Sequence, residues 1–306
     1  MADMISVGKK KNKRKININD RIFNYIVAVV VTVLTIAVLY PIVYILSASF
    51  SSSTAVAQGK VWLLPVDLSL KAYEAVLGYS DLWLGYRNTI FYVIVGTIIN
   101  VAMTMICAYP MARRDLWGRK SLSFFFTFTM LFSGGMIPSY ILVKNLGMLN
   151  TVWALMLPGA MSVYNMIVAR TYIESNIPHE LLESSRIDGC NDVNFFFRMV
   201  LPLSKAIIAV LALWYAVGHW NSYFSAFLYL TEKELYPLQI FLKEILVQSE
   251  FNTEMLTDVK EALEMQNLKL LLKYAVIVVS TVPLFAFYPF VQKYFVKGVT
   301  IGSVKG

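Results

Sequence analysis

The chain has 306 residues, of which 58% are hydrophobic and only 15% are charged. A soluble domain carries about 25% charged residues, so this composition argues against a soluble globular protein. The formal net charge of +8 would suit a nucleic-acid partner, but no segment has the composition of a folded domain that could present such a surface, and no nucleic acid is predicted.

Six windows of the sequence contain no Asp, Glu, Lys or Arg: 22–59, 88–112, 121–143, 145–169, 206–231 and 274–292. A helix needs roughly 20 apolar residues to cross a membrane, and each window has that length or nearly so. Buried helices of a soluble protein would carry polar faces, which most of these windows lack. The sequence therefore predicts an all-α, polytopic membrane protein with six transmembrane helices, at about 22–46, 88–110, 121–143, 151–170, 206–228 and 271–291.

Lys and Arg are unevenly distributed between the segments that join these spans. Of the 27 in the chain, 18 fall in 1–21, 113–120, 170–205 and 293–306, and 9 fall in the other connections. Because cytoplasmic loops are enriched in Lys and Arg, both termini are predicted to be cytoplasmic. The single transmembrane domain, 22–291, then lies between a basic head at 1–21 and a tail at 292–306, and its first span is too long for a signal peptide.

The segment 171–205 has its own helix signals. Pro178 and Glu180 suit the first turn of a helix over about 178–188, and Gly189 suits a left-handed residue that ends it. A second short helix is expected to follow. The two would form a knob on the cytoplasmic surface, where the small side chains of Ser184 and Ser185 allow another protein to approach. The alternative is an ordinary loop on the membrane, and the three phenylalanines at 195–197 suit the lipid interface.

The order of residues in this segment resembles the signature loop of ABC importer permeases, with which such permeases contact their ATPase. The matching residues are Glu183, Ser184, Ser185, Asp188, Gly189, Leu201 and Pro202. Serine replaces alanine twice, and Met199 stands where the family usually has isoleucine. The Gly-rich tail and Trp220-Asn221 are similar to the smaller maltose-transporter permease. The segments 132–138 and 218–221 resemble the lipoprotein and polysaccharide or oligosaccharide branch of this carbohydrate-uptake family.

The resemblance implies the type I importer permease fold in the cytoplasmic membrane of a bacterium. It also implies a second homologous permease, two ATPase subunits that bind ATP and Mg, and an extracellular or periplasmic solute-binding protein. Glu183 would face a basic residue of the ATPase. Contacts of the tail with the ATPases would involve Gly298, Gly302, Lys305 and Gly306. Contacts with the binding protein would involve Tyr236, Pro237, Leu238 and Gln239.

The chain lacks the residues of several other functions. There is no G-x-x-x-x-G-K-[ST] phosphate loop, so ATP hydrolysis is assigned to a separate subunit and the chain itself is predicted not to be an enzyme. No His or Cys cluster has metal-ligand spacing, and no cofactor is expected in this chain. An ion-coupled carrier would need charged residues at the membrane midplane or paired broken-helix repeats, and an intramembrane enzyme would need a converging catalytic set.

The fifth predicted span holds the candidate substrate path. Aromatic rings with hydrogen-bonding neighbours suit sugars, and the candidates are His219, Trp220, Asn221, Tyr223 and Phe227. His219 is either a functional intramembrane residue or a helix-packing hydrogen bonder. The Gly134-Gly135 and Pro138 break in the third span marks either a binding site or a kink. The resemblance to carbohydrate-uptake permeases thus favours a permease for a carbohydrate, and for an oligosaccharide in particular. The alternatives are a permease for another solute or an ion-coupled carrier.

Overall fold

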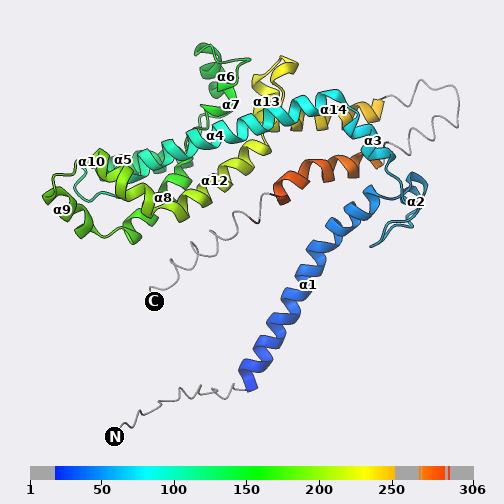
Figure 1. The fold of residues 1–306 in the computed structure, drawn as a ribbon, viewed down its shortest axis with the longest axis horizontal. Helices are drawn as coiled ribbons and strands as arrows, with labels where there is room; N and C mark the ends of the chain where they lie inside the picture. Colours follow the sequence, from blue (N-terminus) through cyan, green and yellow to red (C-terminus); the bar gives the residue numbers. More distant parts are fainter. Residues whose placement is uncertain (1–17, 252–268, 270, 287–288, 290–306) are drawn as a thin grey trace, which may run out of the picture.

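The computed structural model describes residues 18–251, 269, 271–286 and 289, and all regular structure among them is helical (Figure 1). The predicted all-α class is confirmed for these residues. Helix α4, Ser80–Ala112, is the central element, and α8, Val163–Asn176, α12, Lys205–Trp220, and α14, Leu238–Phe251, pack along it. At about 1.5 Å per residue, the 33 residues of α4 span about 50 Å.

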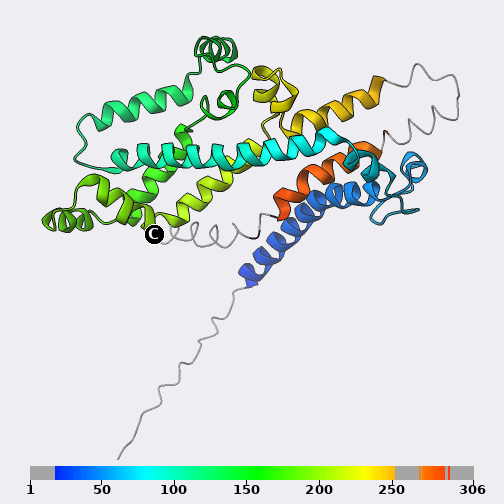
Figure 2. The same cartoon turned by 45° about the horizontal axis from the view of Figure 1, so that its top comes forward.

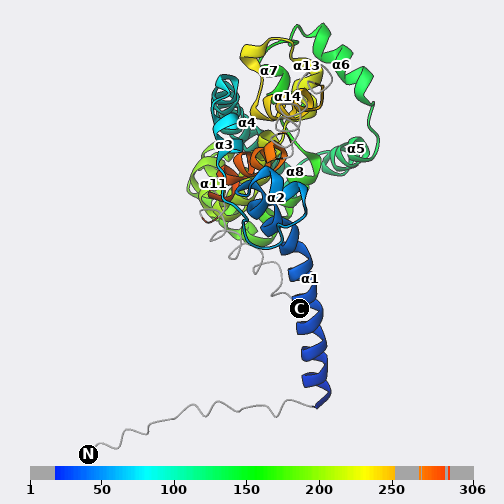
Figure 3. The same ribbon diagram turned by 90° about the vertical axis from the view of Figure 1, so that its right-hand side faces the viewer.

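Helix α1, Ile18–Ser49, leaves this bundle and projects away from it (Figure 3). Its most hydrophobic 18-residue stretch contains no buried residue. A helix that is apolar on all sides is stable only against lipid or another apolar protein surface. The outer end of α1 contacts the bundle through the helix Leu271–Ala286 (Figure 2), where the rings of Tyr44 and Tyr274 meet edge to face at 5.9 Å.

The outer segment after α1 folds back on that helix. It contains the short helices α2, Ser53–Ala57, and α3, Lys71–Leu77. Ser47 Oγ donates to the carbonyl of Leu63 at 2.6 Å, and the amide of Val66 donates to Ser51 Oγ at 3.0 Å. Ser47 in the last turn of α1 and Ser51 just after it thus supply hydrogen bonds that the loop needs where it approaches the apolar helix.

The described residues do not form six uninterrupted spans. By length and composition, α1 and α4 could each cross a membrane alone, and the number rises to four if each of two bent pairs counts as one crossing. The predicted third span is divided into α5, Arg119–Leu131, and α6, Met136–Asn145, with a bend of 111°. The reason is local, because Gly135 has φ +89 in the connection, a backbone conformation that side chains disfavour.

Two further predicted spans are also interrupted. The fourth is divided into α7, Trp153–Met156, and α8, with Pro158 and Gly159 between them. The fifth is divided into α12 and α13, Tyr223–Tyr229, with Asn221 and Ser222 between them. The sixth begins as predicted with Leu271–Ala286, and most of its remainder lies outside the described residues. The predicted break at Gly134-Gly135 in the third span is confirmed, whereas the ends of helices in the fourth and fifth spans were not predicted.

Side-chain hydrogen bonds join α4 to these broken segments. Asn100 Nδ2 donates to the carbonyl of Gly159 at 2.6 Å, and His219 Nε2 donates to Asn100 Oδ1 at 2.6 Å. The Tyr215 hydroxyl accepts from the Ser162 amide at 3.1 Å and contacts Thr104 Oγ1 at 2.7 Å. In an apolar environment a broken helix is tolerated where other groups satisfy its free backbone atoms, and Asn100 does this at Gly159.

Gly96 makes the approach of His219 possible. A Cβ atom at this position would overlap the imidazole of His219. We expect Gly96→Ala to displace the ring from Asn100 and to destabilise the subunit by about 1–3 kcal/mol through overpacking. The apparent melting temperature of the purified transport complex measures this effect.

Gly218→Ala on α12 is the matched control, since a Cβ there would meet no atom within 4 Å. A second control is Gly96→Ala combined with His219→Ala, in which the added methyl has room. If Gly96→Ala were as stable as Gly218→Ala, the close contact between α4 and His219 would be disproved.

Candidate functional site: the coupling loop

The first helix of the segment 171–205 is α9, His179–Ile187. It follows Pro178 and has Glu180 in its first turn, as predicted. The chain then turns at Gly189, which has φ +76. The amide of Gly189 donates to the Arg186 carbonyl at 3.0 Å, and the amide of Cys190 donates to the Ser185 carbonyl at 2.9 Å. These bonds satisfy carbonyls at the helix end, and the predicted left-handed glycine is confirmed.

The second helical segment turns the chain back toward the membrane. It consists of α10, Asp192–Phe195, a π-helical turn, Phe196–Val200, and α11, Leu201–Leu203. Asn191 caps it, because its Oδ1 accepts from the Asn194 amide at 2.8 Å. The chain bends by 79° at Ser204 before α12 begins. The π-helical turn is not predictable from the sequence, which offers only an apolar run ending in Pro202.

The three phenylalanines do not share one environment. Phe195 and Phe196 are buried, with ring centroids 6.3 and 5.4 Å from that of Tyr109 on α4, whereas Phe197 is 60% exposed. The expectation that all three lie at the lipid interface is therefore wrong for Phe195 and Phe196. They form part of the apolar core that attaches the loop to α4.

The residues of the signature motif divide by exposure. Ser185 is buried, and its Oγ donates to the Leu182 carbonyl at 2.8 Å. Glu183 is largely exposed, and its carboxylate lies 3.6 Å from His179 Nε2 within α9. The other motif residues on the exposed face of the knob are Ser184, Asp188 and Gly189. Leu201 is half-buried and Pro202 exposed on the second segment. One exposed surface thus presents a carboxylate beside small residues.

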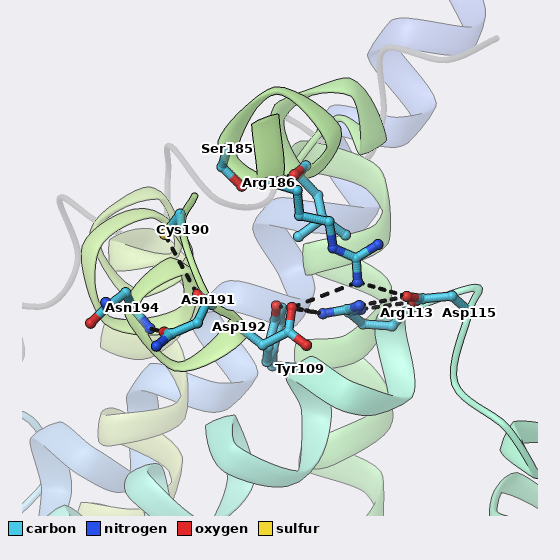
Figure 4. Close-up of polar contacts among 10 residues, drawn as sticks. Tyr109, Arg113, Asp115, Ser185, Arg186, Cys190, Asn191, Asp192 and Asn194 are labelled. Carbon is cyan, nitrogen blue, oxygen red and sulfur yellow. Dashed lines mark hydrogen bonds and ion pairs between the residues drawn. The ribbon is translucent and has the colours of Figure 1, made fainter. Parts of the chain in front are cut away.

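Four charged side chains attach the knob to the end of α4 (Figure 4). We call Arg113, Asp115, Arg186 and Asp192 the charge quartet. Arg113 donates to both oxygens of Asp115, from Nε at 2.8 Å and from Nη2 at 2.5 Å, and Nη1 pairs with Asp192. Arg186 of α9 lies 3.0 Å from Asp115 and 3.8 Å from Asp192. Each arginine therefore contacts both carboxylates.

The quartet is electrostatically favourable at the protein surface. The Arg113 side chain is only 11% exposed, and it also donates to the Tyr109 hydroxyl at 3.1 Å. Hydrogen bonds from Arg113, and secondarily from Arg186, hold the pKa of the Asp115 carboxyl well below its usual range. The bond to Asp115 also raises the pKa of Arg113. Both groups therefore stay charged throughout the physiological pH range.

A second ion-pair cluster lies next to the quartet. Arg119 and Arg170 both contact Glu174, and Arg170 Nη1 donates to Ser123 Oγ at 3.1 Å. These contacts join the start of α5 to α8. Between the ends of α4 and α8 and the start of α9 is a cavity of about 510 Å³, whose lining includes Arg113, Arg114 and Glu180. The end of the bundle that carries α9 thus has a polar surface with a cavity.

The candidate substrate-path residues do not lie together. Trp220 is buried, and its indole N–H donates to the Ser280 carbonyl at 3.0 Å, so it packs the last helix onto α12. His219 faces α4, where it bonds to Asn100. Asn221 is exposed, and the stacked rings of Tyr223 and Phe227 lie 5.9 Å apart with Phe227 66% exposed. Asn221 and Phe227 are therefore the exposed members of the predicted path.

The loop after α13 is held by side chains of α4. Asn88 Nδ2 donates to the carbonyls of Glu234 at 2.7 Å and Tyr236 at 3.0 Å. The amide of Leu238 donates to Thr89 Oγ1 at 2.8 Å. Pro237 and Leu238 are buried and Gln239 half-buried. The predicted binding-protein segment is therefore mostly an anchor, and the adjacent exposed residues are 231–234.

The predicted tail contacts, Gly298, Gly302, Lys305 and Gly306, lie outside the described residues.

Comparison with known proteins decides the family. The family described as binding-protein-dependent transport system inner membrane component matches residues 82–301. The chain belongs to this family. It is 39% identical over 288 residues to the polygalacturonan/rhamnogalacturonan transport system permease protein YtcP of Bacillus subtilis (strain 168), covering 94% of this chain and 99% of YtcP. It is 41% identical over 266 residues to protein LplC of the same strain, covering 87% and 89%.

A solved structure is also similar. It is a bacterial ABC transporter involved in the import of the acidic polysaccharide alginate, and the similar chain shares 35% identity and a TM-score of 0.80. The match covers 91% of this chain and 98% of that one. The described fold is therefore that of a type I importer permease, and the chain is an inner-membrane permease component of a carbohydrate ABC importer rather than a catalytic subunit.

The quartet is the feature of this permease that its sequence did not reveal. Arg113 and Asp115 stood out only as charges of a short loop, and Arg186 and Asp192 flank the motif without belonging to it. The only sequence signal was one pair of opposite charges in each of two segments, and both segments were predicted to lie on the same side of the membrane. Nothing in one sequence shows that those segments touch.

Gly189 provides a test of the loop's backbone. Gly189→Val should distort the turn after α9, because a β-branched residue strongly disfavours φ +76. Space is not limiting, since a Cβ there would meet no atom within 4 Å. We expect the variant to reach the membrane normally but to retain much less ATPase on co-purification.

Gly189→Asn is the matched variant, because asparagine adopts left-handed backbone more readily than other side chains. It should retain most of the ATPase. Equal retention by the Val and Asn variants would show that the left-handed turn does not matter for docking.

Proposed function

We propose that this chain is one of two homologous permease subunits of an ATP-driven importer that takes up an acidic oligosaccharide delivered by a solute-binding protein. The observation that carries the proposal is the knob formed by α9 and α10, which presents Glu183, Ser184 and Asp188 on a surface fixed to α4. Two ATPase subunits, which bind ATP and Mg, would each engage one permease, and Glu183 would face a basic residue of its ATPase.

The exposed apolar helices support the second permease. The most hydrophobic stretch of α1 has no buried residue, α5 has none, and among the residues of α6 only Val143 is buried. Figure 3 shows α5 and α6 standing apart from the bundle. A homologous permease beside this chain, with lipid around both, would cover these surfaces. Substrate would then pass between the two subunits, along a wall that includes Asn221 and Phe227.

The outer surface supports contact with the binding protein. Residues 231–234 are exposed, while their backbone is fixed by Asn150 Oδ1, which accepts from the amides of Thr231 at 3.0 Å and Glu232 at 2.9 Å. Lys233 pairs with Asp81 of α4 at 2.5 Å, and this contact holds the pKa of the Asp81 carboxyl below its usual range. A rigid, polar rim of this kind suits a partner that binds transiently.

The relatives support an acidic sugar. Polygalacturonan/rhamnogalacturonan and alginate, named for the proteins at 39% and 35% identity, are uronic-acid polymers. Relatives named for arabinooligosaccharides and for melibiose, raffinose and stachyose are 26% and 25% identical.

The Gly-rich tail, including Gly298, Gly302, Lys305 and Gly306, would contact the ATPases. A permease for a non-sugar solute is the second candidate.

The orientation can be tested by labelling. With Cys107 and Cys190 replaced by Ala, a single cysteine at Gln58 should react with an impermeant maleimide in intact cells, and one at Ser184 should not. Gln58 follows α2 and Ser184 lies on the knob, at opposite ends of α4 (Figure 1). Labelling of Ser184 in intact cells, or protection of Gln58 there with labelling after lysis, would reverse the topology.

The substrate class is tested with the complete complex in proteoliposomes, supplied with its binding protein and ATP. Galacturonate oligomers should stimulate ATP hydrolysis and enter the vesicles, and maltodextrins of equal length should do neither. Stimulation by maltodextrins alone would refute the acidic class.

A complex with Glu183→Lys is the control, because its lysine should repel a basic ATPase cleft. It should lose stimulation, whereas Glu183→Gln should lose less. Stimulation of the Lys variant at the wild-type level would contradict docking through this residue.

A further inference from the structure

The charge quartet and the anchored loop after α13 are attached at opposite ends of the same helix, α4. We infer that the quartet fixes the coupling helix α9 to α4 so that they move as one body, and that α4 thereby links docking of the binding protein outside to the ATPase inside. Arg113 is the positioning residue at the centre of this link. The inference rests on the proposed function, since it assigns a role to both predicted contact surfaces.

At the inner end of α4, the quartet joins three separate segments of the chain. Arg113 leaves the end of α4 and reaches Asp115 in the following loop and Asp192 at the start of α10, while Arg186 reaches both carboxylates from α9. The planar guanidinium of Arg113 makes these contacts with several donors at once, in a geometry that lysine does not reproduce. Because the Arg113 side chain is 11% exposed, salt screens its contacts less than those of a surface pair.

Apolar packing alone gives α9 little attachment. Among the residues of α9, Leu182 and Ser185 are the buried ones. The stronger apolar contact is made by Phe195 and Phe196, which follow the turn and pack on Tyr109. Without the quartet, the second segment would stay on α4, but α9 could tilt about the Gly189 turn. The quartet therefore determines the angle at which the knob meets an ATPase.

The outer attachment uses the other end of the same helix. Asn88, Thr89 and Tyr92 of α4 all bond to backbone atoms of 234–238. From Asn88 to Arg113, α4 spans about 37 Å at about 1.5 Å per residue, and it is continuous to Ala112. A displacement of the outer loop by a docked partner would thus be carried to the quartet by one unbroken helix.

The experiment uses the complete complex with its binding protein in proteoliposomes. Arg113→Gln, Asp192→Asn and the double variant are compared with Arg114→Gln. Arg114 is exposed and adjacent, and it has no hydrogen bond or ion pair to any other residue in the described part of the chain, so it controls for loss of one cationic side chain. Three quantities are measured for each variant: co-purification of the ATPase, basal ATP hydrolysis, and the ratio of binding-protein-stimulated to basal hydrolysis.

We expect the Arg113 and Asp192 variants to keep the ATPase and basal hydrolysis but to lower the stimulation ratio about fivefold or more, the range of allosteric couplings. The double variant should lower the stimulation ratio no more than the worse single variant does, because both changes break the same attachment of α9 to α4. Arg113→Lys keeps the positive charge but not the planar guanidinium, so it should keep only part of the wild-type stimulation ratio.

A ratio that is unchanged in Arg113→Gln and Asp192→Asn while the wild type is stimulated would overturn the inference. The inference also fails if ATPase retention and basal hydrolysis fall and the ratio does not, since the quartet would then be merely structural. Absence of stimulation in the wild type would instead contradict the proposed function, so the two failures are distinguishable.

Discussion

The attachment of the segment 171–205 to the end of α4 is the constraint on which the rest of this permease depends. A short amphipathic helix such as α9 has too little buried surface to hold a fixed position by itself. Arg113, Asp115, Arg186 and Asp192 supply that position by hydrogen bonds between charged groups, and Phe195 and Phe196 add apolar packing on Tyr109. The exposed residues of the signature motif on and after α9, Glu183, Ser184, Asp188 and Gly189, lie on the face left free by these contacts.

The same helix organises the bundle in the apolar region. Asn100 bonds both the free carbonyl of Gly159 and the imidazole of His219, and Tyr215 bonds Thr104 and the amide that starts α8. Backbone groups freed by a broken helix have no water to bond inside a membrane. Polar side chains on and against α4 supply bonds at these breaks, which explains why a hydrophobic chain retains Asn, Thr and His at buried or partly buried positions. These residues act as internal cross-links among the described helices.

Local features of the fold were predictable, and long-range ones were not. Pro178, Glu180 and Gly189 are signals within a single turn, and they placed α9 almost to the residue. The apolar windows located the membrane segments, and Gly134-Gly135 marked the break in the third of them, but the break at Ser222 has no comparable local signal and depends on how that segment packs. Trp220 illustrates the limit: an aromatic residue near a helix end suits a sugar path or a core equally, and only its bond to Ser280 assigns it to packing.

The central claim is that α9 and α4 form one rigid body through the transport cycle. It is tested most directly by the distance between spin labels on Ser184→Cys of α9 and Ile106→Cys of α4, both exposed, in a complex whose Cys107 and Cys190 are replaced. Pulsed electron paramagnetic resonance would compare the resting complex with the complex bound to ATP and binding protein. We expect one narrow distance distribution that is the same in both states. A distribution that shifts or broadens when the binding protein docks would show that α9 moves independently of α4 and would contradict this account.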